Sequence, residues 1–169
     1  RNKGLRTANG EYIWFVDSDD AIASNAISIL LHRFETHSDC YGINLLWENE
    51  DDGKKTEVGM WNESESLSSG IEFMQNNNHL TPVQRYVVKR DILILNNLFF
   101  YPKILHEDLE YVPRLLYYVA NVDVVGCPLY YYLRRTSGSI TSKISEKNLI
   151  GLCHGFLSVA DFTEKCVDS

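Results

Sequence analysis

Hydrophobic positions recur along the chain with the spacings of alternating strands and helices. Residues 1–9 resemble the end of a helix, with Gly10 as its C-terminal stop. A continuous apolar run at residues 12–16 (YIWFV) predicts a strand that is covered on both faces. Residues 25–36 then predict an amphipathic helix. The apolar face of that helix is expected to comprise Ile27, Leu30, Leu31 and Phe34.

The middle of the chain continues with short elements. In order, they are a strand at 41–48, a turn at 49–55, a short return strand around 57–61, a strand at 83–89 and a helix at 90–98. The first strand, the turn and the return strand are typical of a surface hairpin. After this hairpin, Ser68 or Ser69 is expected to cap a short helix that runs through residues 73–75.

The last third of the chain follows the same alternation. Residues 106–120 begin with acids and carry leucines and valines at helical spacing, which predicts a helix. Pro113 leaves two alternatives: the helix begins near Val112 with the proline in its first turn, or it is kinked at the proline. The remaining elements are strands at 122–126 and 129–135 and an amphipathic helix at 146–165. Because no repeat or composition break divides residues 1–169, we expect one domain of the α/β class.

Composition narrows the class of protein. Of the 169 residues, 44% are hydrophobic, which is typical of a globular domain. The 23 acidic residues exceed the 16 basic ones and leave a net charge of −7, which argues against nucleic acid as a partner because phosphate contacts need a basic surface. The four cysteines form no CxxC pair, so neither a disulfide framework nor a zinc site is expected. The apolar stretch at residues 115–133 is interrupted by Gly126, Pro128 and polar residues, which predicts strands rather than a transmembrane helix.

Two acids directly after the first strand are the first candidates for chemistry. Ligands of α/β sheets bind beyond the carboxyl ends of strands, and on an extended backbone Asp17 and Asp19 share one face while Ser18 turns away. Two carboxylates suit Mg²⁺ or Mn²⁺ and leave coordination sites for the oxygens of a diphosphate. The alternative is that these acids cap the next helix or lie in a solvated turn.

Two further clusters are also candidates. Glu107 and Asp108 begin a predicted helix, where the helix dipole stabilises ionised carboxylates. A carboxylate held there is a candidate general base, although acids that only complement the dipole show the same pattern. Arg134 and Arg135 precede a Gly/Ser loop that includes Ser139, and such groups neutralise phosphates. The alternative is that the two arginines only solvate the edge of a strand.

Three segments together resemble a known enzyme family. The segment RNKGLRTANGEYIWFVDSDD is similar to the ARN-x-G-L-x-x-A-x-GEYI-x-F-(V/L)-DSDD stretch of glycosyltransferase family 2. Further along the chain, HEDLEY and YYYLRRTSGSIT resemble later motifs of the same family, in the same order. The resemblance covers roughly residues 1–140.

The resemblance implies a fold, a reaction and a set of site residues. The fold is a partial GT-A fold, with a mixed sheet flanked by helices, and the reaction is inverting transfer of a sugar from a nucleotide-sugar donor. Asp17 and Asp19 match the metal-binding D-x-D motif, which holds Mn²⁺ or Mg²⁺, and Asp108 matches the catalytic base, with Glu107 as its neighbour. The residues implied to contact the nucleotide or its diphosphate are Arg1, Asn2, Arg134, Arg135 and Ser139.

Several family motifs are absent from the sequence. They are the opening I-P-x-Y-N strand, the D-D-G-S-x-D motif and the QxxRW signature of processive synthases. The resemblance therefore implies the C-terminal, metal- and acceptor-side part of a bacterial non-processive enzyme, which we expect to be inactive by itself. Because the missing strands would leave an apolar sheet edge exposed, we hypothesise that the chain self-associates as a homo-oligomer.

The resemblance also suggests partners and a location. The expected partners are a nucleotide-sugar donor, with a UDP-sugar favoured, and a glycan or lipid-linked acceptor in surface polysaccharide biosynthesis. The expected location is the cytoplasm, with peripheral attachment at the inner face of the membrane as an alternative. Two other functions stay open: a non-catalytic sugar- or nucleotide-binding remnant of the same fold, and a glycoside hydrolase that uses two carboxylates without nucleotide or metal. The presence of both Asp19 and Asp108 favours the transferase.

Overall fold

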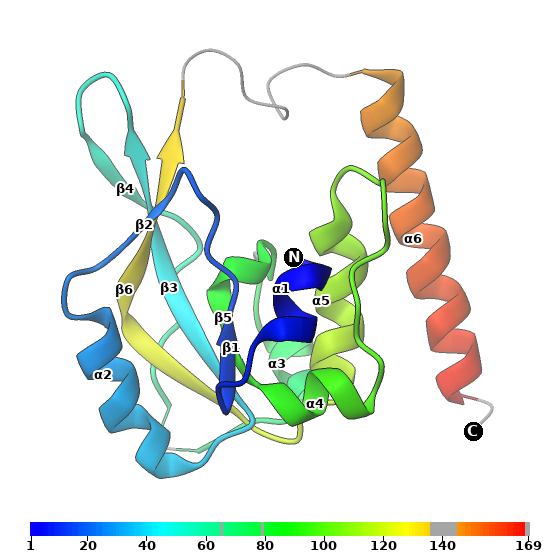
Figure 1. Ribbon diagram of the computed structural model, residues 1–169, viewed down its shortest axis with the longest axis horizontal. Helices are drawn as coiled ribbons and strands as arrows, with labels where there is room; N and C mark the ends of the chain where they lie inside the picture. The colour runs from blue at the N-terminus through cyan, green and yellow to red at the C-terminus, as the bar shows by residue number, and fades with distance from the viewer. Residues whose placement is uncertain (65, 79, 136–144, 168–169) are drawn as a thin grey trace.

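A mixed sheet of six strands, with helices on both faces, forms the centre of the molecule (Figure 1). The computed structural model describes residues 1–64, 66–78, 80–135 and 145–167. The strands are β1 (Tyr12–Trp14), β2 (Ala21–Ile22), β3 (Cys40–Asn49), β4 (Lys55–Glu57), β5 (Tyr86–Lys89) and β6 (Val122–Arg134). The helices are α1 (Asn2–Thr7), α2 (Ala26–Arg33), α3 (Gly70–Asn76), α4 (Arg90–Leu95), α5 (Glu107–Tyr117) and α6 (Glu146–Val167), with 3₁₀ turns η1 (Phe34–Thr36) and η2 (Val83–Arg85).

The sheet is organised around the long pair β3 and β6. Its strand order is β1-β5-β3-β6-β2, with β4 paired to the far end of β3 as the predicted hairpin. Among the strands that the structure describes, β3 and β6 alone run parallel to each other, and all the other pairs are antiparallel. Each face of the sheet carries its own core: α2 packs on one side, and α3, α4 and α5 pack on the other. The predicted α/β class with a mixed sheet is confirmed.

The first strand differs in part from its prediction. Among the described strands β1 pairs with β5 alone, in antiparallel orientation, so it forms an edge of the sheet, and it ends at Trp14 instead of residue 16. Both of its faces are covered as predicted, because Ile13 belongs to one core while Tyr12 and Trp14 pack against the other. Ile13 alone is buried in β1, and Val16, beyond its end, is exposed. The apolar run in the sequence continues past the end of β1 because Phe15, which lies beyond the strand, is needed for another contact. Its ring packs against that of Phe100, next to α5.

Only part of the predicted apolar face of α2 is confirmed: Leu30 lies in the core and Phe34 packs against it. Ala26 and Leu30 are buried against the sheet, whereas Ile27 and Leu31 are 54% and 62% exposed. The helix approaches the sheet through the small side chain of Ala26, and this rotates the two larger residues away from the core. Helical spacing identifies two overlapping apolar stripes here, and it does not say which of them the sheet covers.

Two boundaries and one strand break are corrected by the structure. Residues 83–85, predicted as strand, form the turn η2. Helix α5 begins at Glu107 and contains Pro113 in its interior, so it does not begin near Val112. The two predicted strands at 122–135 are one strand, β6, whose register against β3 shifts at a bulge next to Pro128. A bulge accommodates a proline because one ladder hydrogen bond is already missing there.

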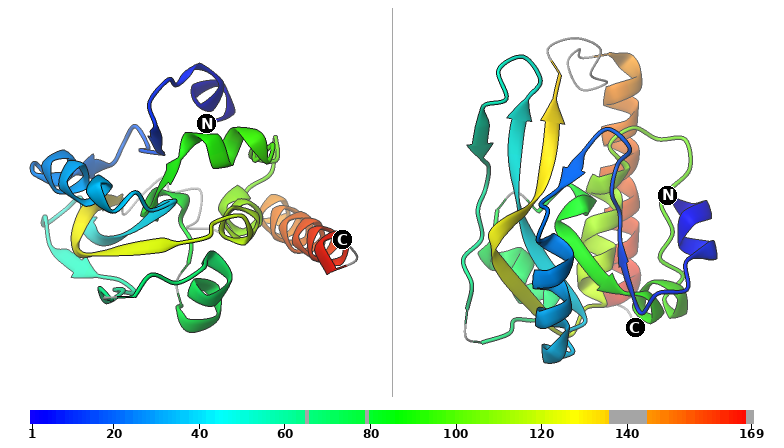
Figure 2. Two further views of the ribbon diagram at one scale, coloured as in Figure 1. Left: turned by 90° about the horizontal axis from the view of Figure 1, so that it is seen from below. Right: turned by 60° about the vertical axis from the view of Figure 1, so that its left-hand side comes forward.

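Helix α6 lies outermost, on the side of α5 that faces away from the sheet (Figure 2). Glu110 is buried between the two helices, where it pairs with Arg114 on α5 and accepts a hydrogen bond from Ser158 on α6. At Gly151 a side chain would collide with the backbone of Leu105, so the glycine allows the close approach. Within the described ranges, none of the helices has both the length and the apolar character that crossing a bilayer requires.

A pair of glycine substitutions tests the packing of α3 against α5. Gly70 begins α3, after Ser69 as the predicted cap, and a Cβ there would overlap the carbonyl group of Leu116 on α5. Gly70→Ala is therefore expected to lower the free energy of unfolding by about 3 kcal/mol, measured by urea denaturation. The control is Gly4→Ala on α1, where the new Cβ has no heavy atom within 4 Å apart from its chain neighbours and the backbone of its own helix. That change should raise stability by about 0.5–1 kcal/mol, and equal effects at both sites would contradict the packing described.

Candidate active site

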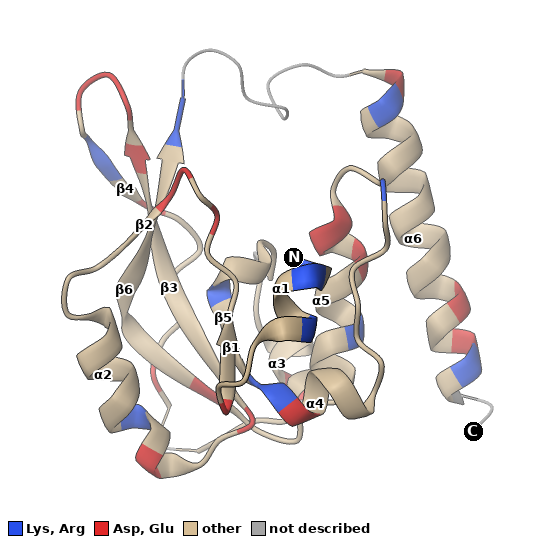
Figure 3. Cartoon of the chain, in the orientation of Figure 1, with Lys and Arg blue, Asp and Glu red and all other residues tan. Residues whose placement is uncertain are grey.

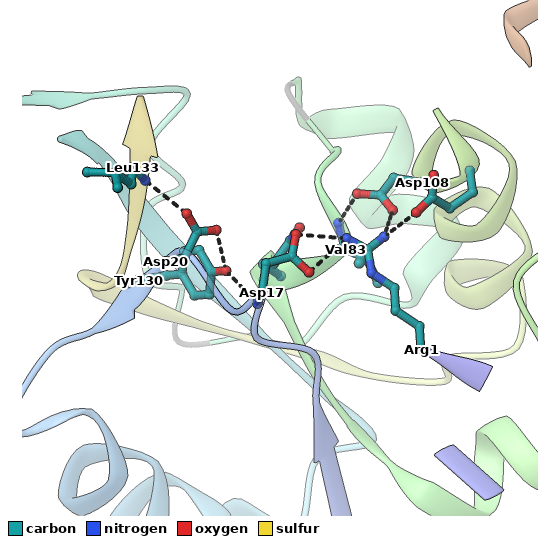
Figure 4. A network of polar contacts seen from close by, with 9 residues as sticks. Arg1, Asp17, Asp20, Val83, Asp108, Tyr130 and Leu133 are labelled. Carbon is teal, nitrogen blue, oxygen red and sulfur yellow. Dashed lines mark hydrogen bonds and ion pairs between the residues drawn. The ribbon is translucent and has the colours of Figure 1, made fainter. Parts of the chain in front are cut away.

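Acids from two distant parts of the sequence meet around one arginine. Asp17 follows β1, whereas Glu107 and Asp108 begin α5, and Arg1 lies directly before α1 (Figures 3 and 4). Nη2 of Arg1 donates to both carboxylate oxygens of Asp17, at 3.0 and 2.9 Å. Nη1 donates to Glu107 at 2.8 Å and to Asp108 at 2.6 Å. The structure thus brings together four of the residues that the sequence singles out.

A stack of aromatic rings holds the segment that carries Asp17 next to the segment that carries Glu107 and Asp108. Phe15, two residues before Asp17, packs edge-on against Phe100 with ring centroids 5.1 Å apart. Phe100 in turn stacks on Tyr111 in α5, at 3.8 Å. Because Tyr111 lies on the same helix as Asp108, one turn along, the stack fixes the end of β1 relative to the start of α5.

The chain enters α5 through an unusual backbone conformation. His106 adopts φ 61° and ψ 35°, in the left-handed region that non-glycine residues seldom occupy. Such a conformation costs about 1 kcal/mol or more and is found preferentially at functional sites. Here it turns the chain so that Glu107 and Asp108 form the first turn of the helix, facing Arg1.

Asp108 is held from two sides. Its Oδ1 accepts from Arg1, and its Oδ2 accepts from the backbone N–H of Val83 at 3.1 Å. Burial raises the pKa of Asp108, and the negative charge of Glu107 adds to this, while Arg1 and the Val83 N–H lower the pKa without cancelling the increase. A buried carboxylate with a raised pKa is a stronger base than an exposed one, which is the property a general base requires.

Arg1 remains positively charged at this position. Burial lowers the pKa of its guanidinium, but the attraction of Asp108, Asp17 and Glu107 outweighs burial, and the pKa is raised. A single positive charge therefore faces three carboxyl groups. The net local charge is negative if all three are ionised, and this favours binding of a further cation.

The acidic loop after β1 does not have the extended geometry assumed above. The backbone turns at Ser18 and Asp19, and Asp19 reaches a different cation, Arg135, at 3.4 Å. Asp20 anchors the loop to β6: its carboxylate accepts from Tyr130 Oη at 2.6 Å and from the Leu133 N–H at 2.9 Å. Asp17 and Asp19 thus follow the same strand, but they contact different arginines.

The remaining predicted contacts have separate surroundings. Arg135 lies near the acidic loop, between Asp19 and Glu50, whereas Arg134 stacks its guanidinium over the ring of Trp47 at 5.1 Å. The amide of Asn2 exchanges two hydrogen bonds with the backbone of Phe100, at 2.9 and 2.8 Å, so it holds α1 in place. Ser139 lies outside the described residues.

One residue of the site is absent from the sequence predictions. The Nε2 of Gln84, in η2, donates to Asp17 Oδ2 at 2.6 Å, one residue after the Val83 N–H that binds Asp108. The turn η2 therefore contacts both acids. The sequence carries no clear signal for it, because Gln84 stands beside Arg85 in a segment of alternating polar and apolar residues, where the strand prediction leaves it without a role.

The carboxylates fit a divalent cation that keeps other ligands. Within the described part of the chain, no three His, Cys, Asp or Glu side chains are grouped closely enough to hold a metal by themselves. Mg²⁺ and Mn²⁺ commonly use one or two carboxylates, with waters and phosphate oxygens completing the shell. The pairing of Asp17 with a guanidinium shows that the position accepts positive charge, so Asp17, with Asp19 nearby, suits such a site.

The charges around Asp108 predict opposite pKa shifts in two variants. Arg1→Gln removes an attractive charge and is expected to raise the pKa of Asp108, whereas Glu107→Gln removes a repulsive one and should lower it. Titration of the ¹³C-labelled carboxyl carbons by NMR measures both shifts. Lys3→Gln removes an exposed charge on α1, two residues after Arg1, and is the control that should leave the pKa of Asp108 unchanged. Shifts of the same sign in the first two variants would contradict the arrangement.

Comparisons with solved structures identify the fold. The chain superposes on the structure of S. aureus TarS 1–349 in complex with UDP-GlcNAc with a TM-score of 0.66, at 19% identity, over 94% of this chain and 45% of that one. The complex of the same protein with UDP gives a TM-score of 0.58, at 22% identity, over 79% and 39% of the two chains. The mixed sheet and its flanking helices are thus part of a GT-A-like fold, as the sequence resemblance implies.

Sequence comparisons identify the family. The chain is 26% identical over 160 residues to the uncharacterized glycosyltransferase YibD of Escherichia coli (strain K12), covering 88% of this chain and 46% of that protein. It is 27% identical over 155 residues to the putative glycosyltransferase EpsH of Bacillus subtilis (strain 168), covering 87% and 44%. The chain thus spans less than half the length of these relatives. The family model "Glycosyl transferase family 2" matches residues 1–94, which is more than half of the chain, and it includes β1 and the acidic loop. The chain therefore belongs to glycosyltransferase family 2.

Proposed function

We propose that this chain provides the metal- and acceptor-side part of an inverting transferase. The enzyme would move a sugar from a UDP-sugar to a hydroxyl group of a glycan or lipid-linked acceptor in surface polysaccharide biosynthesis. The observation that carries this proposal is the convergence of Asp17 and Asp108 on Arg1. The family supports sugar transfer in general, and the TarS structures with UDP-GlcNAc and UDP support a uridine nucleotide donor.

Asp108 is the base in this reaction. Its Oδ1 points toward Arg1 and, beyond it, toward Asp17, so an acceptor hydroxyl that reaches Oδ1 lies between the two acidic segments. Asp108 takes the hydroxyl proton while the oxygen attacks the anomeric carbon from the face opposite the diphosphate. The new C–O bond forms, the bond to the diphosphate breaks, and the configuration at the carbon is inverted.

The departing diphosphate needs positive charge around it. Arg135, which is 44% exposed beside Asp19, is positioned to provide part of that charge. Asp17 and Asp19 would hold Mn²⁺ or Mg²⁺, which, when bound, stabilises the negative charge of the leaving group. The guanidinium of Arg1 provides a further positive charge. The negative diphosphate of the donor competes for it with the carboxylates of Asp17, Glu107 and Asp108.

Calorimetric titration of nucleotides into the full-length natural protein tests the proposal. We expect UDP to bind in the presence of Mn²⁺ and to bind much more weakly after EDTA treatment. The 169-residue chain is titrated in parallel and should bind less tightly, because the opening motifs of the family are absent from it. Silence of the full-length protein toward UDP, GDP and dTDP, with and without metal, would contradict the proposal and favour a non-catalytic protein.

A further inference from the structure

We propose that Gln84 is a positioning residue of this site, which orients the carboxylate of Asp17 toward the divalent cation. The inference rests on the function proposed above. It concerns a side chain that lies behind the acids and that we do not expect to touch the donor or the acceptor.

Gln84 is fixed in place by its own backbone. It is the middle residue of η2 and is 2% exposed. Its carbonyl oxygen accepts a hydrogen bond from Trp14 Nε1 at 2.8 Å, which ties the turn to the last residue of β1. From this position its Nε2 donates to Asp17 Oδ2 at 2.6 Å. The amide thus reaches Asp17 from a rigid part of the fold.

The other end of the same amide has no hydrogen-bond partner. Among the described residues, Gln84 Oε1 is buried and accepts no hydrogen bond. The orientation of the amide is determined by Asp17, because an ionised carboxylate only accepts and therefore requires the NH₂ group. A buried acceptor without a partner destabilises the fold, and an apolar side chain of similar length would avoid that cost. Stability alone therefore does not explain a glutamine here, whereas its contact with Asp17 does.

The contact gains importance when a metal binds. In the structure, Asp17 is held by Arg1 and by Gln84, which share Oδ2. If a divalent cation bound to Asp17 in place of the Arg1 guanidinium, Gln84 would remain as the side-chain donor that orients the carboxylate. Donors of this kind behind a metal ligand commonly change metal affinity by about 10- to 100-fold.

The substitution Gln84→Met, made in the full-length natural protein, separates positioning from stability. Methionine has a similar length and is apolar, so it removes the donor to Asp17 together with the unpaired Oε1. We expect the Kd for Mn²⁺, measured by the electron paramagnetic resonance signal of the free ion, to rise about tenfold. We expect the melting temperature to stay unchanged or to rise. Gln75→Met, at an exposed position on α3, is the matched control and should alter neither quantity.

Each result decides the matter. A weaker Mn²⁺ affinity with an undiminished melting temperature supports the proposal. An unchanged Kd in Gln84→Met overturns it and leaves the proposed function intact. A lower melting temperature, or a variant that does not fold, shows that Gln84 serves stability and also overturns it. Absence of Mn²⁺ binding by the unsubstituted protein contradicts the proposed function, and this inference with it.

Discussion

Replacing Asp108 by asparagine lowers kcat for sugar transfer in the full-length natural protein by about 10²–10⁴-fold, the range that loss of a general base commonly produces. Asparagine has nearly the same shape and still offers an oxygen to the Val83 N–H, but it cannot take the proton of an acceptor hydroxyl. Binding of UDP with Mn²⁺ is expected to persist, because the substitution removes the base and leaves Asp17 and Asp19 in place. Release of UDP during transfer measures the rate, and calorimetry measures the binding.

The control for this variant is Asp91→Asn. Asp91 is an exposed acid in the first turn of α4, so it tests the loss of one carboxylate at a helix start away from the site. It should leave kcat unchanged. If Asp108→Asn keeps more than a tenth of the wild-type rate, another group removes the proton, and Glu107 is the first to examine because it contacts the same arginine.

Loss of Asp19 should remove the metal dependence of nucleotide binding. In Asp19→Ala we expect the affinity for UDP in the presence of Mn²⁺ to fall at least tenfold, to the value measured with EDTA. The side chain of Asp19 is 47% exposed, and its ion pair with Arg135 at 3.4 Å is of a kind that contributes little to stability. The fold should therefore be unaffected, and calorimetry of the variant with and without metal measures the effect directly.

Glu57→Ala, which removes an exposed acid on β4, is the corresponding control. It lowers the negative charge of the protein by the same amount and should retain metal-dependent binding. If Asp19→Ala binds UDP as tightly as the wild type when Mn²⁺ is present, the cation is not held by this acid. Asp17, which lies between Arg1 and Gln84, would then be the ligand to test.

The acids of the site can be predicted from the sequence because each follows a local signal. Asp17 comes after an apolar run, and Asp108 comes at a helix start, where the family resemblance also places the base. Their convergence on Arg1 depends on the aromatic contacts of Phe15 and Phe100, which no local pattern encodes. Gln84 is missed for the same reason, since its partner lies far away in the sequence.

The fold shows a similar limit. Hydrophobic spacing locates β3, the hairpin and α5, whose apolar positions are regular. It is inaccurate at the end of β1 and on part of α2, where the position of a side chain depends on a neighbouring element: Phe15 packs against Phe100 beyond the end of the strand, and Ile27 and Leu31 are exposed. It also divides β6 at Pro128, because the bulge that tolerates the proline is a property of the pair with β3.

The parallel pairing of β3 and β6 has a consequence for synthesis of the protein on the ribosome. β3 is complete at Asn49, but its partner is complete only at Arg134, about 85 residues later. At a typical translation rate of roughly 5–20 residues per second, the ribosome completes β6 roughly 4–17 s after it completes β3. Through this interval the nascent chain carries an apolar strand whose main parallel neighbour does not yet exist. We therefore expect the yield of folded protein in a heterologous host to rise when holdase chaperones are co-expressed or the growth temperature is lowered. The increase should be larger than native-state stability would suggest.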